Sequence, residues 1–357
     1  MIKKYFLWNL SFLIILLSAY GCYAQENPQD IAKTERIIKA YEVGDKIWYQ
    51  NSKGVVSKYD LVSGKILKPF SETVFVDLAT YNDKLIGLKR PVDSEQPHYF
   101  LINILSGESV GPKLTLLDDI PLAITANTNF AYVLSRKSIS ILDKRNKTPK
   151  WKSRKLLEPI QYAPQMSAVV TKSGLVYFGR NQGEWGGGLR SIDPETGVVK
   201  IIQQKKSGDC GDLLFPNCDP VPSIILDPSD SNCVIAAMGL SHFFTRGAIV
   251  TVCDGKITDV YRKSKTKTYK GGREYTYELP FFDIVETQKG WLAATYGEYV
   301  KYSSGIDKAT PYPEFPTRKG ISYVRLDNEF IIITSDVNWG MSLSGTTPLL
   351  VRKIRKP

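Results

Sequence analysis

A loosely repeated pattern of short β-forming stretches constrains the fold of this chain more than any other feature. The fullest copy, residues 166 to 202, reads MSAVVTK-SG-LVYFGR-NQGEWGGG-LRSIDPE-TG-VVKII. Its four stretches are rich in Val, Ile, Tyr and Phe, and they are separated by a short turn, a longer loop and a second turn with Gly. Each copy therefore predicts a four-stranded antiparallel sheet.

The repeats together predict an all-β fold, a single β-propeller. The second stretches begin near residues 47, 85, 130, 175, 233, 291 and 330. Intervals of ~40 to 60 residues are typical of propeller repeats, and no helical periodicity is visible after residue 35. We expect seven blades of four strands over residues 36 to 357. Six or eight blades are alternative counts, because the last two copies are weak and the seventh lacks an outer strand.

The N-terminus has the layout of a secretory signal peptide. Lys3 and Lys4 precede an apolar run, and small residues follow it up to Ala24. The apolar run is shorter than the ~20 residues of a membrane span. The sequence therefore predicts a signal peptide over residues 1 to 24, a flexible leader over 25 to 35 and an exported protein, periplasmic or secreted. A lipid anchor on Cys22 is the alternative, although the bulky Tyr20 fits that motif poorly.

The chain is basic, with a formal net charge of +11, or +9 after loss of the two signal-peptide lysines. The basic residues are scattered except in RKSKTKTYKGGR, residues 262 to 273. We interpret this segment as a solvated loop, and binding to an anionic glycan or a membrane surface is the more specific alternative. Export argues against a nucleic-acid partner. We expect no cofactor, no bound metal and a monomer.

Four cysteines follow the predicted signal peptide: Cys210, Cys218, Cys233 and Cys253. An even number in an exported chain predicts two disulfides. Cys233 and Cys253 are equidistant from Phe243 in a predicted hairpin loop, so antiparallel pairing would place them opposite each other. Cys210 and Cys218 would then close the loop CGDLLFPNC. A zinc site is the alternative, but a Cys-x-x-Cys pair is missing and His242 is the one nearby histidine.

Three short segments resemble motifs of known propeller families. The turns at residues 60 to 64 (DLVSG) and 193 to 197 (DPETG) resemble the Asp-x-x-x-Gly turns of quinoprotein-like repeats. Residues 225 to 239, ILDPSDSNCVIAAMG, resemble the Asp-Pro-x-Asp-x-Asn linker of sortilin-type and xyloglucanase-type propellers. These resemblances imply an exported propeller fold and no particular ligand.

The predicted binding face carries the loops that follow the second and fourth strands of each blade, since these loops share one side of a propeller. The long ones belong to blades four to seven. They supply the candidate ligand-binding residues Glu184, Trp185, His242, Arg246, Glu298, Tyr299, Asp336 and Trp339. Trp185 and Trp339 each precede a glycine and predict stacking platforms. Packing between blades is the alternative role of these indoles, and His242 and Arg246 could equally be structural.

Three functions fit this sequence. The first is a binding module for a glycan, a peptide or a partner protein, acting through the long loops of blades four to seven. The second is a polysaccharide hydrolase or lyase, with Glu184 and Glu298 as an acid–base pair. The third is a scaffold in envelope assembly. We favour binding over catalysis, because the chain has two histidines and no recognisable nucleophile motif.

Overall fold

The computed structural model describes most of the chain downstream of residue 36. The described residues are 37–60, 62–63, 65–67, 73–81, 84–90, 98–204, 210, 213–241, 245–287, 290–295, 298–303, 306–311, 320–326, 330–336 and 349–353. The predicted signal peptide, the leader and Cys22 lie outside these ranges and stay predictions.

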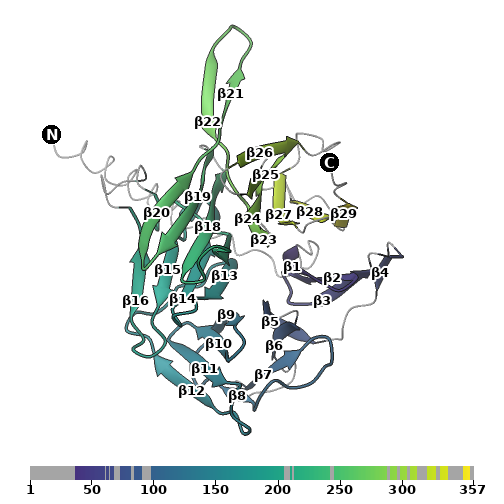
Figure 1. Cartoon of the computed structure of the whole chain (residues 1–357), viewed down its shortest axis with the longest axis vertical. Helices are drawn as coiled ribbons and strands as arrows, with labels where there is room; N and C mark the ends of the chain where they lie inside the picture. Colours follow the sequence, from purple (N-terminus) through teal and green to yellow (C-terminus); the bar gives the residue numbers. More distant parts are fainter. Residues whose placement is uncertain are drawn as a thin grey trace, which may run out of the picture.

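Six antiparallel sheets of four strands stand around a central channel, in the order of the chain (Figure 1). Blade one consists of β1 (Ile37–Val43), β2 (Lys46–Asn51), β3 (Val56–Asp60) and β4 (Lys65–Leu67). Blade two consists of β5 (Val74–Tyr81), β6 (Lys84–Arg90), β7 (His98–Asn103) and β8 (Leu114–Thr115). Blade three consists of β9 (Pro121–Ala126), β10 (Phe130–Ser135), β11 (Ser138–Asp143) and β12 (Trp151–Lys155). Blade four consists of β13 (Gln165–Val170), β14 (Val176–Asn181), β15 (Leu189–Ile192) and β16 (Val199–Ile202). Blade five consists of β17 (Ser223–Leu226), β18 (Cys233–Ser241), β19 (Thr245–Cys253) and β20 (Lys256–Tyr261). Blade six consists of β23 (Asp283–Thr287), β24 (Gly290–Thr295), β25 (Glu298–Ser303) and β26 (Ile306–Pro311). The propeller prediction is confirmed.

The predicted count of seven four-stranded blades is not met. The last repeat forms a three-stranded sheet of β27 (Gly320–Leu326), β28 (Phe330–Asp336) and β29 (Leu349–Lys353). β27 of this sheet contacts β23 of the sixth blade and β1 of the first. The chain thus has six four-stranded blades, the lower of the counts considered, because its last repeat supplies three β-forming segments among the described residues.

A second correction concerns the basic segment after blade five, which we predicted to be a loop. It forms a two-stranded hairpin of β21 (Ser264–Thr268) and β22 (Glu274–Glu278). The hairpin projects away from the ring between β20 and β23 (Figure 1). The period-two alternation of lysines, threonines and tyrosines explains the strands, since neighbouring side chains on a strand point to opposite faces.

The hydrophobic cores lie between neighbouring blades. β14 illustrates the arrangement, because two successive aromatic residues of this strand are fully buried on opposite sides. Phe178 packs in the cluster shared with blade three, and Tyr177 packs in the cluster shared with blade five. A blade of this kind is apolar on both faces, which explains why the strands read as nearly continuous hydrophobic runs.

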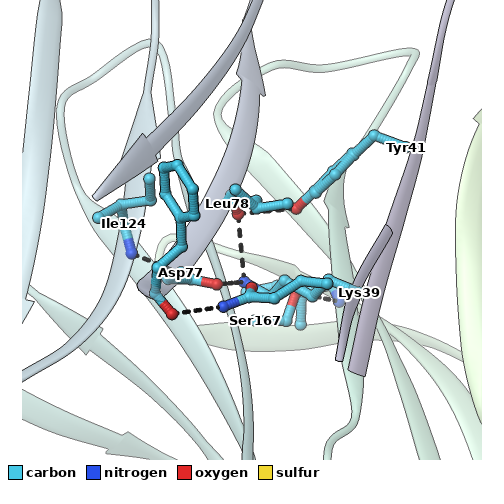
Figure 2. A network of polar contacts seen from close by, with 9 residues as sticks. Lys39, Tyr41, Asp77, Leu78, Ile124 and Ser167 are labelled. Carbon is cyan, nitrogen blue, oxygen red and sulfur yellow. Dashed lines mark hydrogen bonds and ion pairs between the residues drawn. The ribbon is translucent and has the colours of Figure 1, made fainter. Parts of the chain in front are cut away.

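Polar side chains join the inner strands of successive blades. The Tyr41 hydroxyl of blade one donates to the Leu78 carbonyl of blade two at 3.0 Å, and Asp77 accepts from the Ile124 amide of blade three at 2.8 Å (Figure 2). Ser167 of blade four accepts from the Ile224 amide of blade five at 3.2 Å. These contacts satisfy backbone groups at the blade junctions that water would otherwise have to reach.

Both predicted disulfides are present. Cys233 and Cys253 occupy opposed positions of β18 and β19, with their Cα atoms 4.4 Å apart. Cys210 and Cys218 join the two ends of a loop that precedes β17, with Cα atoms 5.5 Å apart. One disulfide therefore links two strands within blade five, and the other links the two ends of the loop that precedes this blade.

Candidate functional site

A cavity of about 710 Å³ lies in the central channel. Inner strands of all six blades line it, and its wall carries both polar and apolar side chains. Asp283 contributes a buried carboxylate whose Oδ1 accepts from the Ile284 amide at 2.9 Å. Within the described residues, no group of three or more His, Cys, Asp or Glu side chains is placed to hold a metal.

An ion pair at the channel wall joins two neighbouring blades. Lys39 Nζ of β1 lies 2.5 Å from Asp77 Oδ1 of β5, and both side chains are almost fully buried (Figure 2). Burial lowers the pKa of Lys39 and the Asp77 carboxylate raises it; the carboxylate prevails, so the ammonium group stays charged. The pair ties blade one to blade two, and each charge is compensated by its partner.

A second candidate surface lies on the predicted binding face, which carries the loops after the second and fourth strands of each blade. Eleven large hydrophobic side chains are exposed among the described residues, and five of them lie on three loops of blades two to four. These five, which we name the apolar band, are 58% to 77% exposed: Leu117, Ile120, Leu157, Tyr162 and Trp185. Exposed hydrophobic residues scattered singly are ordinary, whereas several on neighbouring loops of a rigid scaffold are typical of an interaction site.

Hydrogen bonds hold the three loops of the band together. The Arg136 amide donates to the Ile120 carbonyl, and the Ile160 amide donates to the Arg136 carbonyl, each at 2.8 Å. The Gln182 side chain donates to the Tyr162 carbonyl at 3.1 Å. The loops before β9, before β13 and after β14 thus form one connected layer, so the band is held in place by backbone contacts.

Two arginines of blade four, the buried Arg180 and the half-buried Arg190, lie close to the loops of the band. Arg180 is 2% exposed; its Nη2 donates to Gln161 Oε1 at 3.2 Å, and its Nε has no hydrogen-bond partner among the described residues. Arg190 Nη1 donates to the Gly187 carbonyl at 2.6 Å. Burial, and next the charge of Arg190, lower the pKa of Arg180 to about 10. Arg180 therefore remains cationic at neutral pH. Burial lowers the pKa of Arg190, and the carboxylate of Glu158 lies near enough to act against this effect of burial.

The glycine-rich loop that carries Trp185 is braced by the disulfide loop ahead of blade five. Trp185 ends a short 3-10 turn, Gly183–Trp185, and the chain then passes directly beside the neighbouring loop. The Gly187 amide donates to the Pro216 carbonyl at 2.7 Å, and the Gly188 amide donates to the Asp219 carbonyl at 2.8 Å. A Cβ on Gly187 would lie 1.9 Å from the Arg180 carbonyl oxygen, at a φ of +138°. Glycine is required at this position.

A buried carboxylate holds the bracing loop. Asp219 is fully buried, and its Oδ2 accepts from the Phe215 amide at 2.9 Å. Its Oδ1 lies 3.5 Å from Arg246 Nε of β19, an ion-pair distance. Burial raises the pKa of Asp219 to about 6, against the lowering effect of Arg246. Arg246 therefore forms an ion pair within the protein, as expected for the structural role considered for this residue in the sequence.

The other predicted site residues lie on different blades, and the structure describes only some of them. Glu184 and Trp185 are exposed on the loop between β14 and β15. Glu298 and Tyr299 begin β25, two blades further round the ring, and Asp336 ends β28. His242 and Trp339 lie outside the described residues, as do the side-chain positions of Glu298, Tyr299 and Asp336. The acid–base pair of Glu184 and Glu298 and the Trp339 platform therefore stay predictions.

Sequence reasoning missed most of the apolar band. Leu117, Ile120 and Leu157 stand in short connections that also contain buried residues, such as Leu116 and Leu156. No periodicity separates an exposed leucine from a buried one over two positions in a loop. Arg180 gave a signal that could have been used, since it follows four apolar or small residues inside a predicted buried strand.

Comparisons with known proteins give the fold alone. No family model and no curated protein matches this chain. Among solved structures, the chain is similar to the extracellular domain of a hybrid two-component system from B. thetaiotaomicron, with a TM-score of 0.52 and 13% identity over 91% of this chain. The chain spans 39% of the length of that protein. It is also similar to a chain of the Mitotic Checkpoint Complex, with a TM-score of 0.52, 12% identity, and coverage of 91% of this chain and 93% of the other. No helix in the described part of the chain is long and apolar enough to cross a membrane.

Proposed function

We propose that this chain is an exported β-propeller binding module that recognises a peptide segment of a partner protein through the apolar band. The observation that carries the proposal is the exposure of five large hydrophobic side chains on three hydrogen-bonded loops of one face. Tyr and Trp are the residues that most often dominate binding energy at protein interfaces, and the band contains one of each. The predicted long loops of blades five to seven extend the same face.

The chemistry of the band favours a peptide with apolar and acidic residues. The band supplies aliphatic and aromatic contacts, and the positive charges of Arg180 and Arg190 lie close to its loops. A carboxylate brought near two guanidinium groups gains charge-assisted hydrogen bonds. The two disulfides support export, because such bonds persist mainly in oxidising compartments.

The proposal can be tested by selecting ligands from a displayed random peptide library on the immobilised protein. We expect enriched peptides that pair large apolar residues with Asp or Glu. The double variant Tyr162→Ala/Trp185→Ala should weaken a selected peptide by about ten-fold or more, since central aromatic residues typically contribute over 1 kcal/mol each.

The matched control is Leu105→Ala, because Leu105 is also exposed but lies in the turn after β7, on the opposite face of the ring. This variant should bind the selected peptide as the wild type does. Failure to enrich any peptide, or equal binding by the double variant, would reject the apolar band as a binding surface.

A further inference from the structure

The hairpin β21–β22 separates its side chains into two chemically different faces. Lys265 lies opposite Tyr277 and Lys267 lies opposite Tyr275, so these four side chains share one face. Alternation along the strands extends this face to Tyr269 and Arg273. We name it the basic–aromatic face; its residues are Lys265, Lys267, Tyr269, Arg273, Tyr275 and Tyr277.

The other face carries the small and acidic side chains. The hydroxyls of Thr266 and Thr276 lie 2.9 Å apart, and Glu274 and Glu278 stand opposite Thr268 and Ser264. Residues 262 to 278 contain six basic and two acidic residues. Both acidic side chains therefore belong to the threonine face, which leaves the basic–aromatic face with positive charge only.

Contacts among the side chains order this face. The rings of Tyr275 and Tyr277 are stacked, with centroids 6.0 Å apart, and the Lys267 ammonium lies 5.2 Å from the Tyr269 ring centroid. Tyr269 and Tyr275 are nevertheless 49% and 44% exposed. Rings and ammonium groups are thus spaced along a narrow ribbon that is open to solvent, with same-face neighbours on one strand ~7 Å apart.

The base of the hairpin is fixed to the propeller. The Leu279 amide donates to the Lys263 carbonyl at 2.7 Å, and Leu279 itself is fully buried. The chain then crosses β19 so closely that a Cβ on Gly247 would lie 2.0 Å from the Leu279 carbonyl oxygen. The ribbon therefore projects from a rigid root, and its side chains can be changed without disturbing a blade.

We propose that the basic–aromatic face binds an anionic polysaccharide, as a second site distinct from the apolar band. Sugar rings present faces of C–H groups that pack on aromatic rings, and acidic substituents of the chain pair with Lys267 and Arg273. An extended ribbon that alternates rings and cations matches an extended polymer that alternates sugar rings and anions. Charge complementarity identifies the ligand as a polyanion, and the tyrosines identify it as one with flat apolar surfaces.

Two other polyanions fit this hairpin less well. A bilayer would favour a tip with large apolar residues, whereas the turn between the strands contains Lys270, Gly271, Gly272 and Arg273. Single-stranded nucleic acid also stacks on aromatic rings beside cations. The two disulfides argue against it, because they indicate an oxidising compartment.

The test measures binding of the whole protein to polygalacturonic acid at low salt, with dextran as the neutral comparison. The variant Lys267→Gln/Tyr275→Ala removes one cross-strand pair from the basic–aromatic face. Its counterpart Thr266→Ala/Thr276→Ala removes a cross-strand pair from the threonine face. The variant Lys172→Gln/Lys200→Gln lowers the net charge by two at exposed positions of blade four. A melting curve for each variant confirms that the fold is retained.

We expect the wild type to bind polygalacturonic acid and not dextran. The basic–aromatic variant should bind about five- to thirty-fold more weakly, the range expected for a lost exposed ion pair and a lost aromatic contact. The two control pairs, and also Tyr162→Ala/Trp185→Ala, should bind as the wild type does. Equal weakening by the threonine or charge controls would overturn the proposal. Preferential binding to anionic phospholipid vesicles or to single-stranded DNA would overturn it as well.

Discussion

The Trp185 loop and the hairpin β21–β22 both present aromatic side chains to solvent, but they are held in place differently. The Trp185 loop depends on a neighbouring segment through Gly187, Asp219 and the Cys210–Cys218 disulfide. The hairpin depends on its own cross-strand pairs and on one buried root. Exposure of an aromatic side chain therefore does not show whether its position depends on the rest of the fold. Backbone or covalent changes beneath the Trp185 loop should cost stability, whereas changes at either exposed surface should not.

The largest expected effect is that of Gly187→Ala. Its new methyl group would overlap the Arg180 carbonyl, and the backbone would have to leave the left-handed region. We expect a loss of about 3 to 5 kcal/mol in the free energy of unfolding, since strained backbone and overpacking add. Urea denaturation measures it. Gly183→Ala is the control in the same loop, because its φ is also positive but no atom lies within 4 Å of the new Cβ.

The next effect depends on pH and concerns Asp219. Its pKa in the folded chain, about 6, lies above the ordinary value of 3.8, so the folded state binds the proton more tightly. The stability gained from that proton is complete below the unfolded pKa and is lost as the pH rises through 6. This change amounts to at most about 3 kcal/mol.

Asp219→Asn should remove this dependence, because an amide cannot ionise and can still accept from the Phe215 amide. We expect the variant to be at least as stable as the wild type at pH 7.5. Between pH 4 and pH 7.5 its stability should change less than that of the wild type. Identical pH profiles for the two proteins would contradict the raised pKa of Asp219.

Loss of the Cys210–Cys218 bond should have a similar or somewhat smaller effect. The two residues are eight apart in the sequence. A closed loop of that size is expected to contribute about 2 to 3 kcal/mol through the unfolded state. The double variant Cys210→Ser/Cys218→Ser should also weaken a selected peptide, because the loop that braces Trp185 loosens. Unchanged peptide binding would show that this loop does not position the indole.

The smallest effects are expected at the exposed rings themselves. Trp185→Ala and Tyr275→Ala should each change the free energy of unfolding by no more than about 0.5 to 1 kcal/mol, because neither side chain is in the core. Thermal denaturation of the two variants checks this. A drop of about 3 kcal/mol or more for Trp185→Ala would mean that the indole packs between blades.

The sequence was most informative where local chemistry decides the structure. Alternation and turn residues predicted the blades, and the equal spacing of Cys233 and Cys253 from Phe243 predicted their pairing across β18 and β19. The alternation at Lys265, Lys267 and Tyr269 is equally regular, so the hairpin was predictable from the same rule.

Features that depend on contacts between distant segments were not predictable. Arg246 was a candidate ligand residue, but its partner Asp219 lies 27 positions earlier in the chain and is identified only once the loop folds back. The exposure of Leu117 and Leu157 depends on how three loops pack together.

The central claim is that the apolar band is a binding surface that the fold does not need. Backbone hydrogen–deuterium exchange with and without a library-selected peptide tests it most directly. The account predicts slower exchange in residues 116 to 120, 156 to 163 and 182 to 188, and unchanged exchange in residues 264 to 278. Protection of the hairpin, or of the turns on the opposite face of the ring, with no change in those three loops would contradict it.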